Sequence, residues 1–290
     1  MKKLDNFGER LVPGESHDMD ETIRHKSSYR FFEAVIYGDR PTNPRILDLG
    51  CGVGHGAKTL SRIPGASIFA VDASEDAIEY AKAHYSADNI EYVAAKADEY
   101  LQLGLTFDYV VSRHALEHIP NGLELATRFN YSRRLIVNVP YMEPASDNGV
   151  DLRNPHHELN EISEEHFAQY PNRAFFFEDL AGVTSRTADG ANSIICIASA
   201  SGMPQVSIDM PFPAWRPSRL EELGLNAEQR VAAAAFSEAA KFEEINAALK
   251  STAERLRKTE EALGAARAQL SRPIVRTALF FAQKLGRLGS

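Results

Sequence analysis

Between residues 45 and 200, short apolar runs alternate with amphipathic stretches. Apolar runs of about four to eight residues bounded by turn residues are typical of strands buried on both faces. We predict strands at 45–50, 67–72, 90–95, 107–112, 134–141, 174–179 and 192–199. Strands that alternate with helices predict a doubly wound, mostly parallel α/β sheet of seven strands. No helical stretch separates the last two strands, so we expect them to form an antiparallel hairpin at one edge.

Polar residues mark the ends of two intervening helices. Ser74 opens the amphipathic stretch 74–87, and Ser163 precedes a stretch that Pro171 ends. Serine accepts hydrogen bonds from the free N–H groups of a first helical turn, and proline cannot continue a helix. We therefore predict helices that begin at these two serines.

The pattern changes after residue 205. Residues 206–225 are rich in proline and polar groups, which is typical of a linker. Residues 226–270 carry a heptad pattern. Threonine and alanine fill one of its two seam positions, so the predicted coiled coil is weak. It either joins copies of the chain through residues 242–270 or is a single long helix that packs back on the domain. The seam comprises Phe242, Ile245, Leu249, Thr252, Leu256, Thr259, Leu263, Ala266 and Leu270.

The last segment, 271–290, combines positive charge with one apolar helical face. It has no acidic residue and four basic ones: Arg272, Arg276, Lys284 and Arg287. A basic amphipathic helix is typical of a segment that lies in a membrane interface, and anionic lipid is then its partner. The alternative is a tail that packs on a partner subunit. The apolar face comprises Ile274, Ala278, Phe281, Leu285 and Leu288.

The composition narrows the classes of protein to which the chain can belong. The 290-residue chain has a net charge of −8, 44% hydrophobic residues and two cysteines, Cys51 and Cys196. An acidic chain lacks the basic footprint of a nucleic-acid-binding protein, and two cysteines are too few for a disulfide framework. The first residues lack the apolar core of a signal peptide. We expect a cytoplasmic protein whose folded domain is residues 1–205, peripheral at the inner membrane if the tail binds lipid.

The stretch ILDLGCGVGHG places glycines directly after the first strand. Glycine is needed where backbone N–H groups must approach a ligand closely. Asp48, inside the strand, would repel a pyrophosphate and attract a cationic ligand, which disfavours a dinucleotide. Asp72 ends the next strand, where it can accept hydrogen bonds from ribose hydroxyls. The alternative is a tight turn that binds no ligand.

This stretch resembles the first motif of the class I S-adenosylmethionine-dependent methyltransferases, and the resemblance covers about residues 7–200. It implies that the methionine part of the cofactor passes over the glycine turn. Where the family often has an acid near the adenine, this chain reads AAKADEY, with Lys96 at the usual acidic position. The cofactor-binding residues implied by the resemblance are Asp48, Gly50, Cys51, Gly52, Gly54, Asp72, Ala73, Ala97, Asp98 and Ser112.

Two further stretches are similar to a bacterial methyltransferase group that accompanies surface-polysaccharide assembly. FGERLVPGE and RHKSSYRFF resemble its entry segment, which reads GER-x-VP and later H-x-x-RY. NPHHELNEISEEHF resembles its NP-x-H-x-x-E segment. The likeness implies a glycan acceptor, with Tyr29, Arg30 and Arg113 as candidates for binding a sugar or an anion. For Arg113, an ordinary surface charge is the alternative.

Strand four ends in the cluster SRHALEH, which has three interpretations. In the first, His114 is a general base that takes a proton from an acceptor hydroxyl. In the second, His114, Glu117 and His118 hold a divalent metal that His156 or His157 completes. In the third, Glu117 and His118 begin a helix, hold the cofactor loop and contact the acceptor. His156 and His157 lie in the family-like segment and are candidates for acceptor contact or catalysis.

The expected activity is methyl transfer from S-adenosylmethionine to an oxygen of a sugar or a sugar-linked phosphate, with the reacting atoms held in line. An enzyme that acts on a soluble small metabolite is the first alternative. A non-catalytic assembly or chain-length factor, which uses the fold as a binding module, is the second.

Overall fold

The computed structural model describes residues 19–143, 146–147, 150–151, 154, 156–212 and 257–259. The chain divides into two compact units, Met1–Ala233 and Ala234–Ser290. Of the second unit only the helical residues 257–259 are described, so the predicted coiled coil and basic tail otherwise lie outside the described residues. Among the described helices, none is long and apolar enough to cross a membrane.

The first unit is built around one large sheet. All seven predicted strands are present, and the sheet has eight because Thr184–Ser185 adds a strand too short to leave a pattern. In chain order the elements are α1 (Met19–Gly38), β1 (Arg45–Leu49), α2 (His55–Leu60), β2 (Ser67–Asp72), α3 (Glu75–His84), β3 (Ile90–Ala94), α4 (Ala97–Leu101), β4 (Thr106–Arg113), η1 (Leu116–His118), α5 (Gly122–Thr127), β5 (Asn130–Pro140), β6 (Ser146–Asp147), β7 (Val150–Asp151), η2 (Glu164–Phe167), β8 (Ala174–Asp179), β9 (Thr184–Ser185) and β10 (Ala191–Ser199).

The strand order of the large sheet is β3-β2-β1-β4-β5-β10-β8-β9. Neighbours from β3 to β5 are parallel, whereas β10 pairs antiparallel with both β5 and β8. The predicted edge hairpin is therefore confirmed. From β1 the chain proceeds outward through β2 and β3, and it then returns to β4 on the other side of β1. At such a reversal, outside the carboxyl ends of the neighbouring strands, doubly wound sheets have the crevice in which they bind ligands, so we expect the crevice of this sheet at the ends of β1 and β4.

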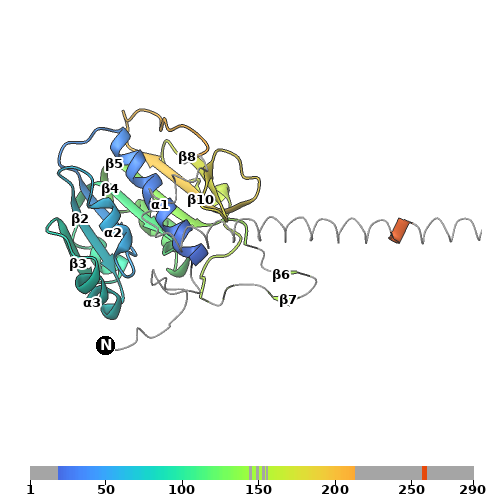
Figure 1. The fold of residues 1–290 in the computed structure, drawn as a ribbon, viewed down its shortest axis with the longest axis horizontal. Coiled ribbons are helices and arrows are strands. Elements are labelled where there is room, and N and C mark those ends of the chain that lie inside the picture. The colour runs from blue at the N-terminus through green and yellow to red at the C-terminus, as the bar shows by residue number, and fades with distance from the viewer. Residues whose placement is uncertain are drawn as a thin grey trace, which may run out of the picture. The chain divides into compact units, whose positions relative to one another are not determined.

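Helices cover both faces of the sheet (Figure 1). Buried residues of α1, α2 and α3 pack on one face, and residues of α4, α5 and η2 pack on the other. Strand residues alternate between the two cores, so Ile46 contacts the first core and Leu47 the second. The two serine caps are confirmed: Ser74 accepts from the N–H of Ala77, and Ser163 forms a capping box with His166 at η2.

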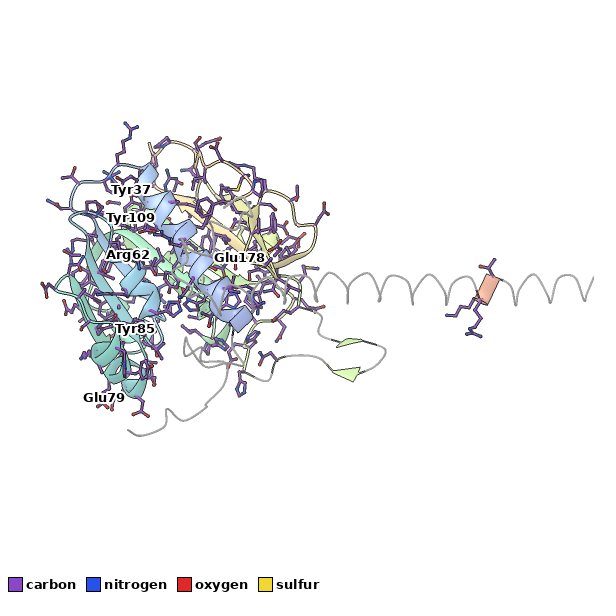
Figure 2. The ribbon with its side chains drawn as sticks, viewed as in Figure 1. Tyr37, Arg62, Glu79, Tyr85, Tyr109 and Glu178 are labelled. Carbon is purple, nitrogen blue, oxygen red and sulfur yellow. The ribbon has the colours of Figure 1, made fainter. Side chains whose placement is uncertain are left out.

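The helix α1 is fixed to the sheet at its middle and just after its C-terminal end. Just after that end, Asp39 accepts two 2.7 Å hydrogen bonds from the buried guanidinium of Arg134 on β5. Tyr109 of β4 also donates to Asp39, at 3.1 Å. In the middle of the helix, Ser28 donates to Glu178 of β8 at 2.8 Å, and Figure 2 shows Glu178 beside α1. These bonds hold α1 against β4, β5 and β8.

Candidate active site

The glycine turn leaves the end of β1 and folds back under β2. The N–H groups of Gly50 and Cys51 both donate to the carbonyl of Val71, at 2.8 and 3.0 Å. Gly50 has φ +76°, and a Cβ there would lie 2.2 Å from the Cβ of Ala115. Gly52 has φ +53°, and nothing lies within 4 Å of where its Cβ would be. Gly50 is thus required by the packing of the protein itself, whereas Gly52 leaves open space beside its backbone.

Asp72 is held at the end of β2 by two backbone donors. Its carboxylate accepts from the N–H of Gly52 and from the N–H of Ser74, each at 2.9 Å. Each carboxylate oxygen has a second lone pair, so the group can still accept from two hydroxyls. The exposed Ala73 lies between Asp72 and the cap of α3. Asp72, the residue predicted to bind the ribose, is therefore oriented before any ligand binds.

Asp48 is fully buried below the turn. Its Oδ1 accepts a 2.9 Å hydrogen bond from the hydroxyl of Tyr29, and its Oδ2 has no partner among the described residues. Burial raises the pKa of Asp48 to about 7, against the opposing effect of the Tyr29 hydrogen bond. A cationic ligand would stabilise the ionised carboxylate, which agrees with the prediction that Asp48 favours a positively charged ligand.

The other predicted cofactor residues surround this turn. Ser112 is buried and donates to the carbonyl of Leu49, which joins the ends of β4 and β1. Cys51 is buried, and burial raises the pKa of its thiol well above the usual range. Ala97 and Asp98 begin α4 directly beyond β3, with Ala97 buried and Asp98 exposed. All of them lie at the carboxyl ends of the parallel strands.

Arg113 is buried and links β4 to α1 through hydrogen bonds. Its Nε donates to Ser28 at 3.1 Å and its Nη2 to Glu21 at 2.7 Å, and it is 4% exposed. Burial raises the pKa of Glu21, but the positive charges around it, that of Arg113 first, outweigh this effect and lower it. Burial raises the pKa of Glu178, the next group in the network, to about 7. Arg113 is therefore not an ordinary surface charge, because it ties β4 to α1.

The two candidate acceptor residues on α1 are placed differently from each other. Tyr29 is 1% exposed, and its hydroxyl is used by Asp48, so it supports the cofactor side of the crevice. Arg30 is partly exposed and pairs with Glu33 on the same helix. The structure brings Tyr29 to the crevice and leaves Arg30 in an intrahelical ion pair.

His114 lies where β4 enters the crevice. Its backbone adopts φ +46°, which is uncommon for a residue with a side chain, and its N–H donates to the carbonyl of Asn138. Its Nε2 is 3.1 Å from the hydroxyl of Ser193, its Nδ1 is 3.9 Å from a Glu117 oxygen, and the side chain is 21% exposed. Burial and the charge of Arg113 hold the pKa of His114 well below its usual value. The imidazole is therefore neutral at neutral pH, the form that can accept a proton.

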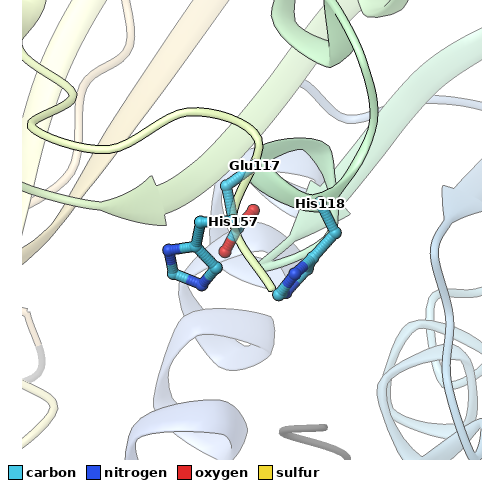
Figure 3. A group of neighbouring side chains, drawn as sticks. All are labelled: Glu117, His118 and His157. Carbon is cyan, nitrogen blue, oxygen red and sulfur yellow. The ribbon is translucent and has the colours of Figure 1, made fainter. Parts of the chain in front are cut away.

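Glu117, His118 and His157 form a compact group (Figure 3). One possible ligand atom from each lies within 4.8 Å of the others, and the two rings are 4.7 Å apart. The Glu117 and His157 side chains are 0% and 2% exposed. Ligand atoms around one zinc-sized ion lie up to about 4 Å apart, so small side-chain movements would bring these three around a divalent metal. Two imidazoles and a carboxylate suit a transition metal better than magnesium.

The predicted metal set is thus only partly assembled. The structure brings His157 to Glu117 and His118, whereas His156 is exposed and donates its backbone N–H to Asn154. The loop is fixed because the N–H of Glu158 donates to the carbonyl of Glu117 at 2.8 Å. His114 lies at the edge of the group. In the sequence these neighbouring histidines could not be told apart.

The structure adds residues that the sequence did not indicate. Ser193 on β10 and Asn138 on β5 are both fully buried beside His114, and neither amide atom of the Asn138 side chain has a partner among the described residues. The partly buried His25 and the buried His55 form a second group next to Tyr29. The polar start of the last predicted strand, Asn192 and Ser193, was a usable signal for Ser193, because residues 194–198 of that strand are all apolar.

The sequence family described as a methyltransferase domain matches residues 46–131, which run from β1 into β5 and include the glycine turn, Asp72 and His114. Over these residues the chain is similar to a methyltransferase domain. The open space beside Gly52, the unpaired oxygen of Asp48 and the oriented Asp72 fit S-adenosylmethionine, which carries a positive charge and a ribose.

Named relatives match only part of the domain. The mitochondrial ubiquinone biosynthesis O-methyltransferase of Schizosaccharomyces pombe is 45% identical over 128 residues, which are 41% of this chain and 46% of that protein. The enzyme of the same name from Mesorhizobium japonicum is 39% identical over 77 residues, or 26% of this chain and 30% of the relative. The chain thus spans less than half the length of these relatives.

Solved structures show weaker likeness. The magnesium protoporphyrin IX methyltransferase of Synechocystis PCC 6803, with bound S-adenosylmethionine, has 17% identity and a TM-score of 0.45, with coverage of 67% of this chain and 88% of that one. The methyltransferase domain of bacterial CtHen1 has 16% identity and a TM-score of 0.47, covering 61% and 100%. At these values the fold assignment rests on the strand order and the domain match.

Proposed function

We propose that this protein transfers a methyl group from S-adenosylmethionine to an oxygen atom of its acceptor. The observation that carries the proposal is the position of His114 directly after β4, at the edge of the sheet where the strands that carry the open glycine turn, Asp48 and Asp72 also end. The bound sulfonium supplies an activated methyl group. Asp48 and Asp72 hold the two ends of the donor, and His114 accepts the proton of the acceptor hydroxyl as the new carbon–oxygen bond forms and the carbon–sulfur bond breaks.

The burial of the site supports this assignment of roles. Asp48 and Ser112 are each 1% exposed or less, so these residues of the donor side are shielded from bulk water. A dry site strengthens the interaction of a carboxylate with a cation. His114, in contrast, keeps 21% of its side chain exposed, so it can meet an acceptor that enters from solvent.

For the acceptor we propose a hydroxyl of a sugar or a sugar-linked phosphate in surface-glycan synthesis. The support is the likeness of the RHKSSYRFF and NPHHELNE segments to glycan-associated methyltransferases. The names of the partial relatives favour a second candidate, the phenolic hydroxyl of a quinone precursor. A soluble small metabolite and a non-catalytic assembly role remain the further alternatives.

A divalent metal is a second part of the proposal. Glu117, His118 and His157 are the residues that would hold it, with Glu143 3.0 Å from His157 as a neighbour that orients the ring. A metal there would acidify an acceptor hydroxyl and position it beside His114. Its loss would then lower the rate of methyl transfer without weakening cofactor binding.

We also propose that residues 242–270 join copies of the chain and that residues 271–290 bring the protein to an anionic membrane surface. The support is the heptad pattern and the basic amphipathic pattern of the sequence. Such a tail would place the domain near lipid-linked acceptors.

The test is transfer of labelled methyl from S-adenosylmethionine into fractionated host extract by the full chain, with and without a chelator. Label in lipid-linked glycans supports the glycan acceptor, and label in quinone precursors supports the second candidate. Label in soluble metabolites alone would move the assignment to a small-molecule enzyme. If no fraction is labelled although the cofactor binds, the catalytic proposal is wrong, and the result favours the non-catalytic assembly role.

A further inference from the structure

Side chains of α1 contact the sheet near the carboxyl ends of two parallel strands. Tyr29 donates to Asp48, the next-to-last residue of β1, at 2.9 Å. Glu21 accepts a 2.7 Å hydrogen bond from Arg113, the last residue of β4. The ligand crevice is expected at the ends of these two strands. Movement of α1 away from the sheet would therefore change the walls of the crevice.

A further link between α1 and the sheet is a fully buried carboxyl. Glu178, on β8, is 0% exposed, and its Oε2 accepts a 2.8 Å hydrogen bond from the hydroxyl of Ser28 in the middle of α1 (Figure 2). The same hydroxyl accepts from the Nε of Arg113 at 3.1 Å. The carboxyl is thus connected to the guanidinium through a neutral hydroxyl.

The second oxygen of this carboxyl, Oε1, has no hydrogen-bond partner among the described residues. Glu178 pairs across the strands with Ser193 of β10 and Thr184 of β9, both 0% exposed, and Thr184 Oγ1 also lacks a partner among the described residues. Directly paired residues have Cβ atoms about 4.5 to 5.5 Å apart, so a change of rotamer brings Oε1 to the Thr184 hydroxyl. A neutral carboxyl has a proton to donate there.

The charged groups that face Glu178 come from α1 and β4. They are Glu21 and Arg24 on α1 and Arg113 on β4, whereas the residues paired with Glu178 on β9 and β10 carry neutral hydroxyls. Burial raises the pKa of Glu178 to about 7, against the opposing charge of Arg113. Burying a carboxylate that no cation bonds directly is costly. The neutral carboxyl is therefore the form that suits the docked helix.

We propose that Glu178 is a proton-dependent latch on α1: the neutral carboxyl holds the helix on the sheet, and its ionisation lets the helix open from the strand ends. The inference rests on the proposed function only in taking these strand ends as the active site. It adds regulation of that site by pH, because the helix that contacts Asp48 and Arg113 opens more readily as the proton leaves Glu178.

The direction of the pH effect follows from the two states of the helix. With α1 docked, the pKa of Glu178 is about 7, and with α1 open, water reaches the carboxyl and the pKa returns to its ordinary value of 4.5. Between these values the docked state holds one more proton, so docking weakens as the pH rises. The latch acts fully below pH 4.5 and is lost above 7. From pH 5.5 to 7.5, opening should become about 20-fold more favourable through Glu178.

Hydrogen exchange of the full chain, read by mass spectrometry on peptides from residues 19–38, measures the opening of α1 without cofactor or acceptor. Glu178→Gln keeps the shape of the neutral carboxyl and cannot ionise. Because burial also shifts the pKa of His25 and of Asp48 at the α1 contact, the quantity compared is the opening constant of the unaltered protein divided by that of the variant. We expect this ratio to rise about 20-fold from pH 5.5 to 7.5. Glu165→Gln, at an exposed glutamate of η2, is the matched control and should behave like the unaltered protein.

Carbon-13 NMR of labelled glutamate carboxyls provides a second measurement, because the signal missing from Glu178→Gln belongs to Glu178. We expect this signal to titrate near pH 7. A ratio that stays constant between pH 5.5 and 7.5, or a signal that titrates at or below pH 5, would overturn the inference. Neither result would change the methyltransferase proposal, which the labelled-methyl assay decides. If the ratio rises and no methyl is transferred, the latch is established and the assignment of the active site is wrong.

Discussion

Ser193 Oγ lies 3.1 Å from His114 Nε2, so a fully buried hydroxyl on β10 holds the ring at the end of β4. The side chain of Asn192 also donates to this hydroxyl, at 3.3 Å. The pairing of β10 with β8 shifts register between Ala191 and Ser193, and such irregularities re-aim side chains. The contact covers Nε2 and leaves Nδ1 as the nitrogen that faces Glu117.

Ser193→Ala should release the His114 ring. We expect Nε2 to carry the proton in the unaltered protein, with Ser193 as acceptor, and both tautomers to be populated in the variant, because the partner that selects one is lost. Nitrogen-15 NMR of the labelled imidazole reads the tautomer directly. Ser185→Ala, which removes an exposed hydroxyl on β9, is the control. An unchanged tautomer in Ser193→Ala would show that Ser193 does not set it.

His114→Gln should slow methyl transfer by about 100-fold or more if the ring is the general base. Because burial and Arg113 lower the pKa of His114, the unaltered enzyme should keep its rate as the pH falls through 6.5 and lose it only at lower pH. The ring is the active base above its pKa and is protonated below it. A pH profile of the rate at saturating S-adenosylmethionine, with the acceptor from the extract assay, checks this, and a loss centred at pH 6.5 or higher would contradict it.

Replacement of the proposed metal ligands should lower the amount of bound metal and the turnover rate, and it should leave cofactor affinity unchanged. Glu117→Gln and His157→Asn are expected to lower the metal content of the purified protein at least about tenfold, because each removes one of three donors. Elemental analysis measures the content, and titration with S-adenosylhomocysteine measures affinity. His156→Asn is the control on the neighbouring residue, and equal metal loss in this variant would argue against the group in Figure 3.

Alanine substitutions at two glycines of the turn should have different effects, one mainly on cofactor binding and the other mainly on stability. Gly52→Ala enters open space at positive φ, so it should cost only about 1 kcal/mol of unfolding free energy but abolish cofactor binding, because the methyl occupies the ligand's space. Gly50→Ala meets Ala115 at 2.2 Å and should cost about 2 kcal/mol or more. Gly190→Ala, also at positive φ with nothing within 4 Å, is the control. Thermal unfolding and titration together test the contrast, and unchanged cofactor affinity in Gly52→Ala would contradict it.

Cofactor affinity should depend on the protonation of Asp48. Its pKa of about 7 means that the carboxyl is largely protonated below pH 7 in the free protein, and the ammonium of the ligand requires the ionised form. Affinity for S-adenosylhomocysteine should therefore fall by up to about tenfold per pH unit below 7. Calorimetry between pH 5.5 and 7 measures this. Asp48→Asn should remove the dependence, whereas a flat profile in the unaltered protein would contradict the role.

The sheet could be predicted from the sequence because its strands are buried on both faces and leave continuous apolar runs. The helix α1 could not, because buried polar residues such as Arg24 and Ser28 blur its apolar stripe. Their partners are far away in the sequence, because Ser28 contacts Glu178 and Arg113, and Arg24 donates to the carbonyl of Leu180. The burial of Arg113 was unpredictable for the same reason, since its partner Glu21 lies 92 positions earlier.

Within the site, the turn and the two aspartates were predictable because spacing along the chain fixes them relative to adjacent strands. The choice between His156 and His157 was not, because a loop determines which neighbour turns inward. That loop is positioned by backbone bonds to the carbonyl of Glu117, which no side-chain pattern reveals.

The Tyr29–Asp48 bond links the matched domain to a helix outside it, since the family match begins at residue 46. A fragment cut at the family boundary would keep the glycine turn and lose its covering ring. The surface of Gly56 that Tyr29 covers would then be exposed, and Asp48 would lose its one described hydrogen-bond donor. The structural unit that holds the glycine turn in this chain is therefore larger than the segment that matches the family, because it includes α1.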